Sequence, residues 1–372
     1  MTDLVVVSLE RWDDVWRRNQ HLVDGLLRAD PGLRILFVEP AADPLHDVLS
    51  RRRPHLGRAL SDIGRPAAGR LWAIAPVKWL PRRLDRRTDE RLAKTVVRAA
   101  KQLGMEQPRL WINDPGMVAV SELSGWPTVY DITDDWAVAD RPAGELERTV
   151  TNEARLLRAA REVVVCSPEL ARRKGNGQRI TLIPNAVDVA AYRRPVPRPL
   201  DLPKGPTAIY VGTVHDDRID VDLCEATAIG LRGTGTLVLV GPNLLASADS
   251  RRLERVGVQV LGPRPRDSVI AYLQHADVLV VPHLVTPFTE SLDPIKLYEY
   301  RAVGRPVVST PVAGFRDASD LRVTVAEGAS FVTAVAAAVP AADVFPHGAD
   351  GPVPDWADRV EAMRRVIEEL AL

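Results

Sequence analysis

The stretch Asp293-Pro-Ile-Lys-Leu-Tyr-Glu-Tyr-Arg-Ala-Val-Gly-Arg-Pro-Val-Val308 predicts a polar helix that ends just before a buried strand. Pro294 suits the first helical turn, and Gly304 suits the left-handed position that follows the last turn. The apolar run from Pro306 to Thr310 is typical of a short strand. A helix that leads directly into a buried strand is the repeating unit of a parallel α/β sheet.

Two charged residues of this segment indicate a possible ligand. Lys296 and Glu299 are three residues apart, so both side chains lie on one helical face near the positive end of the helix dipole. A diphosphate placed there would meet backbone N–H groups and the lysine, and Glu299 could accept hydrogen bonds from ribose hydroxyls. From spacing alone, a surface helix with an intrahelical Lys–Glu pair is an equally good interpretation.

Short β-branched runs alternate with helical patterns along the whole chain, which predicts an α/β fold with two doubly wound parallel sheets. The proline-rich stretch 188–205 separates two sets of such runs. The runs lie at 4–7, 35–38, 72–74, 110–112, 128–131, 163–166 and 181–183, and at 208–211, 237–240, 258–261, 278–281, 307–309 and 323–325. The predicted organisation is a Rossmann-like domain over 1–187, a linker over 188–205, a second Rossmann-like domain over 206–352 and a terminal helix within 353–372.

Composition excludes several classes of protein. The 372 residues include 49 basic and 49 acidic side chains, so the chain lacks the net positive charge of a nucleic-acid-binding protein. Cys166 and Cys224 lie far apart and read as buried thiols in a reducing compartment. We find neither a secretory leader pattern nor an apolar run of membrane-spanning length, so we expect a cytoplasmic protein.

The segment at 293–308 resembles the P-x-K-x-x-E-[YA]-x-A-x-G-x-P-V-V motif of GT-B glycosyltransferases of the broad family 4. "IPNAVD", "YVGTVHDDRID", "LVGP" and "LGPRPRDSVIAYLQHADVLVVP" precede it in family order. In the first half, "LFVEP", "PVKWLPRR", "LWINDP" and "YDITDDW" resemble teichuronic-acid and xanthan types of polysaccharide glycosyltransferase. The resemblance implies a hexosyltransferase whose two Rossmann-like domains face each other across a cleft, with the last helix packing back on the first domain. It also implies no cofactor and no metal, with a nucleoside-diphosphate sugar as the donor substrate.

The chain departs from the family pattern at two places. The first glutamate of the family's E-x7-E pair would fall at Ser291, with Glu290 one place away, so only the second, Glu299, is matched. Ala186 stands where the family usually has glycine, which is tolerable only if that residue is not left-handed.

Other donor-binding residues are predicted from their positions just after strands and from the resemblance to the family. Gly212 would let the backbone approach a phosphate, and Arg218 would neutralise the departing diphosphate, unless it pairs instead with a neighbouring aspartate. Arg264 falls where relatives line the base pocket, although an ordinary turn fits the spacing equally well. The full predicted donor-binding set is Gly212, Arg218, Arg264, Glu290, Ser291, Asp293, Ile295, Lys296 and Glu299.

Three carboxylates at the end of the strand near 128–131 are candidates for catalysis. Asp134 is our first choice for the base that deprotonates the acceptor, with Asp135 and Asp131 as alternatives. A helix-capping cluster is the competing interpretation. Retaining relatives commonly have a histidine in this neighbourhood, and its absence favours inversion. On the acceptor side, Arg18, Asn19 and His21 follow the first strand closely enough to reach a substrate, although a solvated helix face explains them too.

The sequence therefore predicts a metal-independent glycosyltransferase that acts on a hydroxyl acceptor, either a natural product or a cell-surface or lipid-linked glycan. A nucleotide-sugar epimerase and a non-catalytic partner of another transferase are the alternatives. The basic segment Ser50–Arg65 has apolar residues at near-helical spacing and could contact the inner face of an anionic membrane, although a surface helix or loop is an alternative interpretation.

Overall fold

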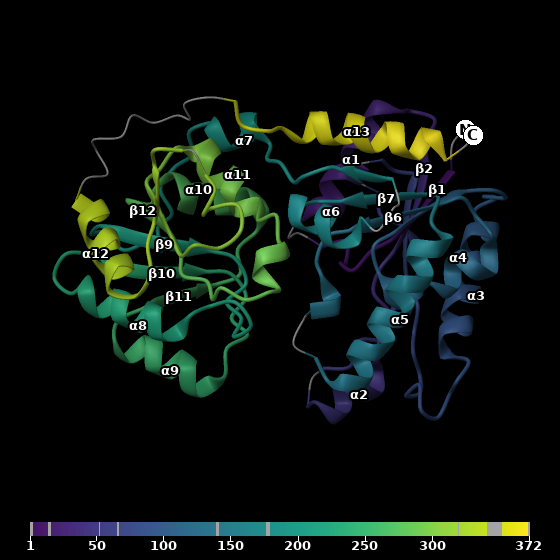
Figure 1. Cartoon of the computed structure of the whole chain (residues 1–372), viewed down its shortest axis with the longest axis horizontal. Helices are drawn as coiled ribbons and strands as arrows, with labels where there is room; N and C mark the ends of the chain where they lie inside the picture. Colours follow the sequence, from purple (N-terminus) through teal and green to yellow (C-terminus); the bar gives the residue numbers. More distant parts are fainter. Residues whose placement is uncertain are drawn as a thin grey trace. The chain divides into compact units, whose positions relative to one another are not determined.

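A computed structural model describes residues 3–13, 16–51, 53–64, 67–138, 141–175, 179–318, 320–340 and 352–370. The chain forms two compact units, each with its own sheet. The N-terminal unit comprises residues 1–184 and 356–372, and the C-terminal unit comprises residues 185–355 (Figure 1).

The N-terminal unit contains an eight-stranded sheet in the order β3-β4-β2-β1-β5-β6-β7-β8. All neighbouring strands pair in parallel except β3, which runs antiparallel to β4 at the edge. The strands are β1 (Asp3–Val7), β2 (Arg34–Val38), β3 (Arg58–Asp62), β4 (Leu71–Ala75), β5 (Arg109–Ile112), β6 (Thr128–Ile132), β7 (Glu162–Val165) and β8 (Ile180–Leu182).

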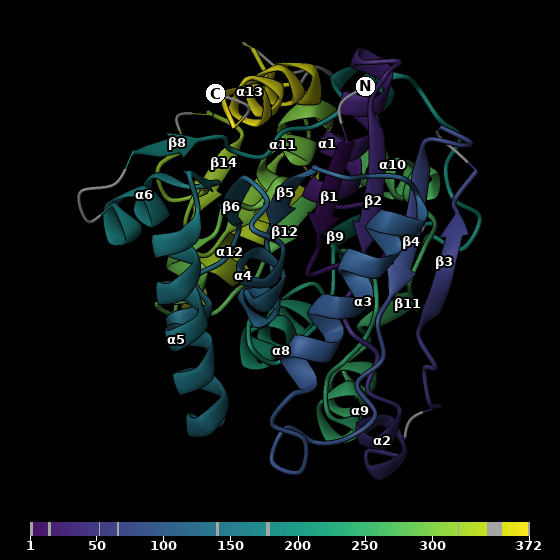
Figure 2. The ribbon, with the colours of Figure 1, turned by 90° about the vertical axis from the view of Figure 1, so that its right-hand side faces the viewer.

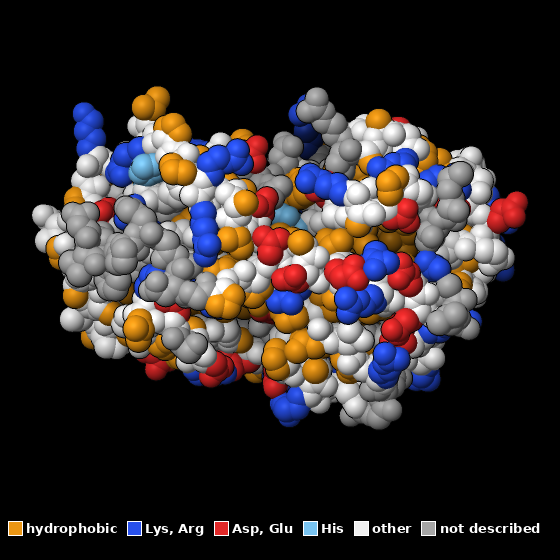
Figure 3. Space-filling model, turned by 90° about the horizontal axis from the view of Figure 1, so that it is seen from above, with side chains coloured by type: hydrophobic (Ala, Val, Ile, Leu, Met, Phe, Trp, Pro, Cys, Tyr) orange, Lys and Arg blue, Asp and Glu red, His pale blue; other side chains and the backbone are white. Residues whose placement is uncertain are grey.

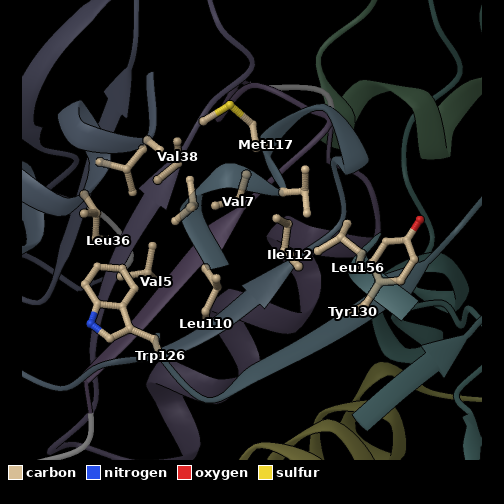
Figure 4. Packing of buried hydrophobic residues seen from close by; sticks show 14 of the residues in the cluster. Val5, Val7, Leu36, Val38, Leu110, Ile112, Met117, Trp126, Tyr130 and Leu156 are labelled. Atoms are coloured by element: carbon tan, nitrogen blue, oxygen red, sulfur yellow. The ribbon is translucent and has the colours of Figure 1, made fainter. Parts of the chain in front are cut away.

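Helices cover both faces of this sheet because its central strands are buried on both sides. Alternate strand residues such as Val5, Leu36, Leu110 and Tyr130 pack with α3, α4 and α5 in one core (Figure 4). Asp131 projects to the opposite face, where it meets α1. The helices are α1 (Arg18–Ala29), α2 (Pro44–Leu49), α3 (Thr88–Gln102), η1 (Pro115–Met117), α4 (Ala119–Ser124), η2 (Trp136–Val138), α5 (Ala143–Ala159), α6 (Pro168–Lys174) and α13 (Trp356–Glu369).

The terminal helix α13 packs on α1 through an apolar stripe. His21 stacks on Trp356 with ring centroids 4.6 Å apart, and Gly25 lies beneath Val360, where a larger side chain would collide. Met363 and Ile367 continue the buried face. The opposite face of α13 carries intrahelical ion pairs such as Glu361 with Arg364, and acidic and basic side chains are interspersed on the side of the molecule seen in Figure 3.

The C-terminal unit contains a six-stranded, fully parallel sheet in the order β11-β10-β9-β12-β13-β14. Its strands are β9 (Thr207–Val211), β10 (Thr236–Val240), β11 (Gln259–Gly262), β12 (Val278–Val281), β13 (Val307–Ser309) and β14 (Val323–Val325). Its helices are α7 (Val189–Arg193), α8 (Val221–Gly230), α9 (Ser247–Arg255), α10 (Arg266–Gln274), η3 (Thr289–Ser291), α11 (Ile295–Val303) and α12 (Gly328–Ala338). Figures 1 and 2 show these helices on both sides of the sheet, as in a doubly wound fold.

The structure confirms the two doubly wound sheets, and every predicted strand is present within two residues of its expected ends. Two segments differ from prediction. Residues 188–205 do not form a detached linker, since Tyr192 and Leu202 are buried in the core of the C-terminal unit. Ser50–Arg65 contains the edge strand β3 instead of an amphipathic helix, because Leu60 packs against the core while its neighbours pair with β4. Arg52 and Arg65 of this segment lie outside the described residues.

Candidate functional site

The strand order of the C-terminal unit reverses between β9 and β12, and ligands of doubly wound folds bind beyond the carboxyl ends of strands at such a point. Gly212 follows β9 and His283 follows β12. The donor-motif helix α11 runs from Ile295 to Val303 after Pro294, and Gly304 ends it at φ 70°, as predicted. The three segments bring the predicted phosphate-binding residues to one edge of the sheet.

Lys296 is the central charge of this edge. A Cβ built on Gly212 would lie 2.5 Å from the Lys296 Nζ, so only glycine leaves room for the ammonium, and its φ of 144° also favours glycine. The Lys296 Nζ lies 5.0 Å from the centroid of the Tyr210 ring. Among the described residues, no hydrogen bond or ion pair neutralises it. Burial lowers the pKa of Lys296 to about 8, with Glu299 opposing that effect and Arg218 adding to it.

Arg218 and His283 complete the polar surroundings of Lys296. The Arg218 guanidinium donates to both carboxylate oxygens of Asp217, at 2.9 and 3.2 Å, which is the pairing with a neighbouring aspartate considered above. Burial, followed by the nearby Lys296 and Arg218 charges, holds the pKa of His283 well below its usual range. The His283 ring is therefore neutral, and its Nε2 lies 3.1 Å from the Tyr210 hydroxyl.

Glu299 lies on the same face of α11 as Lys296 and is held from outside the helix. The Tyr192 hydroxyl donates to the Glu299 Oε1 at 2.5 Å. Just before α11, Asp293 accepts from the Asn185 backbone N–H at 2.5 Å and from the Tyr298 hydroxyl at 2.7 Å. The predicted residue Asp293 therefore ties the helix start to residue 185, and Ile295 is the first residue of the helix itself.

Three other predicted donor residues have partners of their own. Arg264 donates to Asp201 at 2.6 Å and to the Tyr272 hydroxyl at 2.9 Å. The Ser291 hydroxyl is buried and donates to the Phe288 carbonyl at 2.7 Å. Glu290 pairs with Arg316 at 2.8 Å, although its Oε1 is buried with no partner among the described atoms. Arg264 and Ser291 thus have structural contacts, and their contact with the donor stays a prediction.

Ala186 does not require the glycine that the family usually has at its position. Among the described residues, Arg51 is the one non-glycine residue with a positive φ, so Ala186 is not left-handed. Its side chain is fully buried, which explains why a small residue is retained.

Asp131 of the N-terminal unit is fully buried within β6 and is neutralised there. The Arg18 guanidinium donates to both of its oxygens at 3.2 Å, and the Trp111 indole N–H donates at 3.2 Å. The Asn113 amide contacts the same carboxylate at 3.2 Å. Such a satisfied, solvent-excluded ion pair is a structural feature, so Asp131 is poorly placed to accept a substrate proton.

Asp135 is also paired internally. The Lys174 ammonium lies 2.7 Å from Asp135 Oδ1, and the Arg173 guanidinium donates to Oδ2 at 3.1 Å. Lys174 additionally contacts Glu153 at 2.9 Å. Asp135 therefore joins α5 and α6 to the end of β6.

Asp134 differs from its two neighbours because it is only partly buried and accepts from the Thr133 hydroxyl at 3.0 Å. Close to it lies Glu10, three residues beyond the end of β1. The Glu10 Oε2 is buried without a hydrogen-bond partner among the described atoms, and the Arg17 Nε is 4.0 Å from Oε1. Burial raises the pKa of Glu10 to about 7, with Arg17 opposing that effect and Asp134 and Asp13 adding to it.

The predicted acceptor-side residues of α1 have structural partners. Arg18 is buried against Asp131, and the Asn19 amide donates at 2.9 Å to both Ser8 Oγ and Asn113 Oδ1. His21 stacks on Trp356 of α13. These side chains join α1 to the sheet and to α13, and their contact with an acceptor stays a prediction.

Sequence reasoning missed Glu10, Tyr192 and Tyr210. Glu10 follows β1 at the switch point between β1 and β5, so the strand-end rule that selected Asp134 also applied to it. Tyr210 is a buried strand residue, and no sequence pattern separates it from an ordinary core tyrosine. Tyr192 lies within the stretch that we assigned to a linker.

Within the described ranges, no helix combines the length and apolar character needed to cross a membrane.

Residues 205–342 match the family model described as Glycosyl transferases group 1. The chain is 25% identical over 218 residues to the "Putative teichuronic acid biosynthesis glycosyltransferase TuaH" of Bacillus subtilis (strain 168), and the match covers 54% of this chain and 55% of that relative. This chain therefore matches only about half the length of that curated relative.

Solved structures resemble this chain over nearly its whole length. The OtsA apo structure has a TM-score of 0.64 at 11% identity and covers 100% of this chain and 99% of its own. Anabaena Alr3699/HepE in complex with UDP has a TM-score of 0.61 at 14% identity, covering 99% and 100%. At these identities the likeness concerns the fold alone. The chain thus has the GT-B fold of two Rossmann-like domains, and its residues 205–342 are similar to the Glycosyl transferases group 1 family.

Proposed function

We propose that this protein is a glycosyltransferase that moves a sugar from a nucleoside-diphosphate sugar to a hydroxyl group of an acceptor. The observation that carries the proposal is Lys296, a partly buried ammonium without an ion-pair partner among the described residues. A cation held largely out of water is costly unless an anion neutralises it, and a diphosphate is the anion that the donor motif is built to receive.

The C-terminal unit would hold the donor. Lys296 and Arg218 would contact the diphosphate, with Gly212 allowing close approach of the backbone, and Glu299 would accept hydrogen bonds from the ribose. His283 would stay neutral beside the two cations, so it would not add further charge to the site. This donor assignment is supported by the UDP bound to HepE, a protein of the same fold.

The N-terminal unit would supply the proton acceptor. In the proposed step the acceptor oxygen forms a bond to the anomeric carbon while the bond from that carbon to the phosphate oxygen breaks. The electron pair of the broken bond leaves with the nucleoside diphosphate, and the hydroxyl proton passes to Asp134, which is only partly buried at the end of β6, whereas Asp131 and Asp135 are buried in ion pairs. Glu10 would share that proton, because each of two nearby carboxylates raises the other's proton affinity.

We further propose that the transfer needs no metal, since Lys296 and Arg218 would stabilise the charge on the leaving diphosphate. The D-x-D sequence Asp220-Val-Asp222 makes structural contacts. Asp220 caps α8 by accepting from the Leu223 N–H at 2.9 Å, and Asp222 pairs with Arg252.

The test is to incubate the protein with UDP-, dTDP- and GDP-sugars in the presence of EDTA and to measure release of nucleoside diphosphate with and without hydroxyl acceptors. A transferase releases nucleotide in proportion to glycosylated product. An epimerase interconverts sugars without an acceptor, and a non-catalytic partner does neither. The anomeric configuration of the product, read from proton NMR couplings, distinguishes inversion from retention.

The proposed acceptor is presented at a membrane surface, which refines the prediction for Ser50–Arg65. Exposed apolar side chains at one end of the N-terminal unit include Leu49, Leu56, Trp79 and Leu84. Exposed arginines accompany them, namely Arg51, Arg53, Arg83, Arg86 and Arg87. Hydrogen bonds from Lys78 N–H to the Ala42 carbonyl and from His55 N–H to Asp47 join the segments that carry these residues. Figures 1 and 2 place α2 and the chain entering α3 at the same end of the unit.

This apolar–basic surface has the chemistry that an anionic lipid interface attracts, and its apolar residues would enter the headgroup region. Co-sedimentation with vesicles of phosphatidylglycerol and phosphatidylcholine tests it. We expect binding that falls with salt and with the substitutions Trp79→Ser and Leu84→Ser. The membrane assignment would be contradicted if the protein co-sedimented equally well with purely zwitterionic vesicles, or if neither substitution reduced vesicle binding. Either result would leave the transferase assignment intact.

A further inference from the structure

Tyr192 stands out because a buried tyrosine of α7 contacts the residue proposed to bind the ribose. Its side chain is 5% exposed and packs in the core with Val187, Leu202 and Tyr298. The ring is therefore fixed by packing, and its hydroxyl is delivered to the Glu299 Oε1 at 2.5 Å. A phenol held in this way restricts the rotamers available to the carboxylate that it contacts.

The segment that carries Tyr192 is attached to α11 at a second point. Asn185 donates from its backbone N–H to the Asp293 carboxylate at 2.5 Å, and from its side-chain amide to the Asp293 carbonyl at 2.6 Å. The Asp188 carboxylate caps α7 by accepting from the Ala191 N–H at 2.9 Å. Residues 185–193 therefore form a frame that contacts α11 both at its start and at Glu299.

We infer that Tyr192 is a positioning residue that orients the Glu299 carboxylate toward the donor's ribose and so sets the preference for ribose over 2′-deoxyribose. This inference rests on the proposed function. A carboxylate can accept about four hydrogen bonds, so a hydrogen bond from Tyr192 does not by itself exclude hydrogen bonds from ribose hydroxyls. A polar site that is held rigidly rejects an analogue lacking the hydroxyl more strongly than a site that can rotate away.

The experiment measures the affinities for UDP and 2′-deoxyUDP, with GDP and 2′-deoxyGDP alongside, in wild type, Tyr192→Phe and Glu299→Ala. Phenylalanine keeps the buried ring and removes only the hydroxyl. We expect Tyr192→Phe to lower the ribose preference about tenfold, toward the value of Glu299→Ala, because a hydrogen bond to a charged group is lost. With sugar donors, KM should rise while kcat stays near its wild-type value.

Tyr272→Phe is the matched control, since the Tyr272 hydroxyl also donates to an aspartate, Asp201, at 2.6 Å in the same unit but does not contact Glu299. It should leave the ribose preference unchanged. If Tyr192→Phe kept the wild-type preference for ribose while Glu299→Ala lost it, the role of Tyr192 would be wrong, but Glu299 would still be the ribose-binding residue. An unchanged preference in Glu299→Ala, or no nucleoside diphosphate binding by wild type, would overturn the ribose assignment itself.

Discussion

The two units differ in whether the charged side chains at their strand ends have partners within the protein. In the N-terminal unit, Asp131 and Asp135 are neutralised by Arg18 and by Lys174 with Arg173. In the C-terminal unit, Lys296 has no such partner among the described residues, and burial lowers its pKa to about 8. A strand-end charge with an internal partner stabilises the fold, whereas one without a partner is available to a ligand. By this criterion Lys296 is available to a ligand in the C-terminal unit, and Glu10, whose Oε2 has no hydrogen-bond partner among the described atoms, is available in the N-terminal unit.

The largest effect should come from Asp134→Asn, which tests whether the partly buried carboxylate of its cluster accepts the acceptor's proton. The amide keeps the size of the side chain but cannot accept a proton, so turnover should fall on the order of a hundred- to ten-thousandfold while donor binding persists. Steady-state kinetics and nucleotide titration check this. Normal turnover in Asp134→Asn together with loss in Asp135→Asn would move the base to Asp135, and normal turnover in all three single Asn variants would favour a retaining mechanism.

Asp131→Ala should affect stability instead of chemistry. It leaves the Arg18 guanidinium buried without its carboxylate, which typically costs about 3–5 kcal/mol. Urea denaturation measures the loss. Asp222→Ala is the control, because the Asp222 side chain is 81% exposed and its pair with Arg252 should contribute little. If Asp131→Ala were as stable as wild type but inactive, Asp131 would be catalytic and the comparison between the units would be wrong.

The raised pKa of Glu10 predicts how kcat/KM depends on pH. With a pKa raised to about 7, Glu10 is protonated below that pH and cannot share the acceptor's proton. The rate kcat/KM should therefore decrease as pH falls below 7, approaching a slope of about tenfold per pH unit. Glu10→Gln should remove this limb of the profile. A profile that keeps the same limb in Glu10→Gln would assign the titration to another group.

The lowered pKa of Lys296 predicts a second, weaker pH dependence, in which the affinity for UDP decreases as pH rises. Because the pKa of Lys296 is about 8 before the donor binds, the ammonium loses its proton as pH rises through 8. Above that pH, Lys296 must take up a proton when it binds the anionic diphosphate. Affinity for UDP should decrease between pH 7.5 and 9.5, by at most about tenfold per pH unit. Calorimetry in buffers of different ionisation enthalpy reports the proton uptake directly, and its absence at pH 9 would show that Lys296 does not face the diphosphate.

The fold was more predictable than the site because apolar periodicity is a local property of the chain. Strands such as β9 and β6 are continuous apolar runs, and α11 carries its own start and end signals at Pro294 and Gly304. Which polar side chains pair with each other, in contrast, depends on residues far apart in the sequence. Arg18 meets Asp131 across 113 residues, and Tyr192 meets Glu299 across 107, so spacing predicted neither the buried ion pair nor the contact between residues 185–193 and α11.

The proposed donor site requires that a nucleoside diphosphate binds at Lys296. Calorimetric titration of UDP and GDP at pH 7 in EDTA, with wild type and Lys296→Met, measures it, because methionine keeps the apolar stem and removes the charge. We predict binding of at least one nucleotide by wild type and about ten- to a hundredfold weaker binding by Lys296→Met, with no loss of thermal stability. Equal affinity in the two proteins would contradict the donor site proposed for the C-terminal unit.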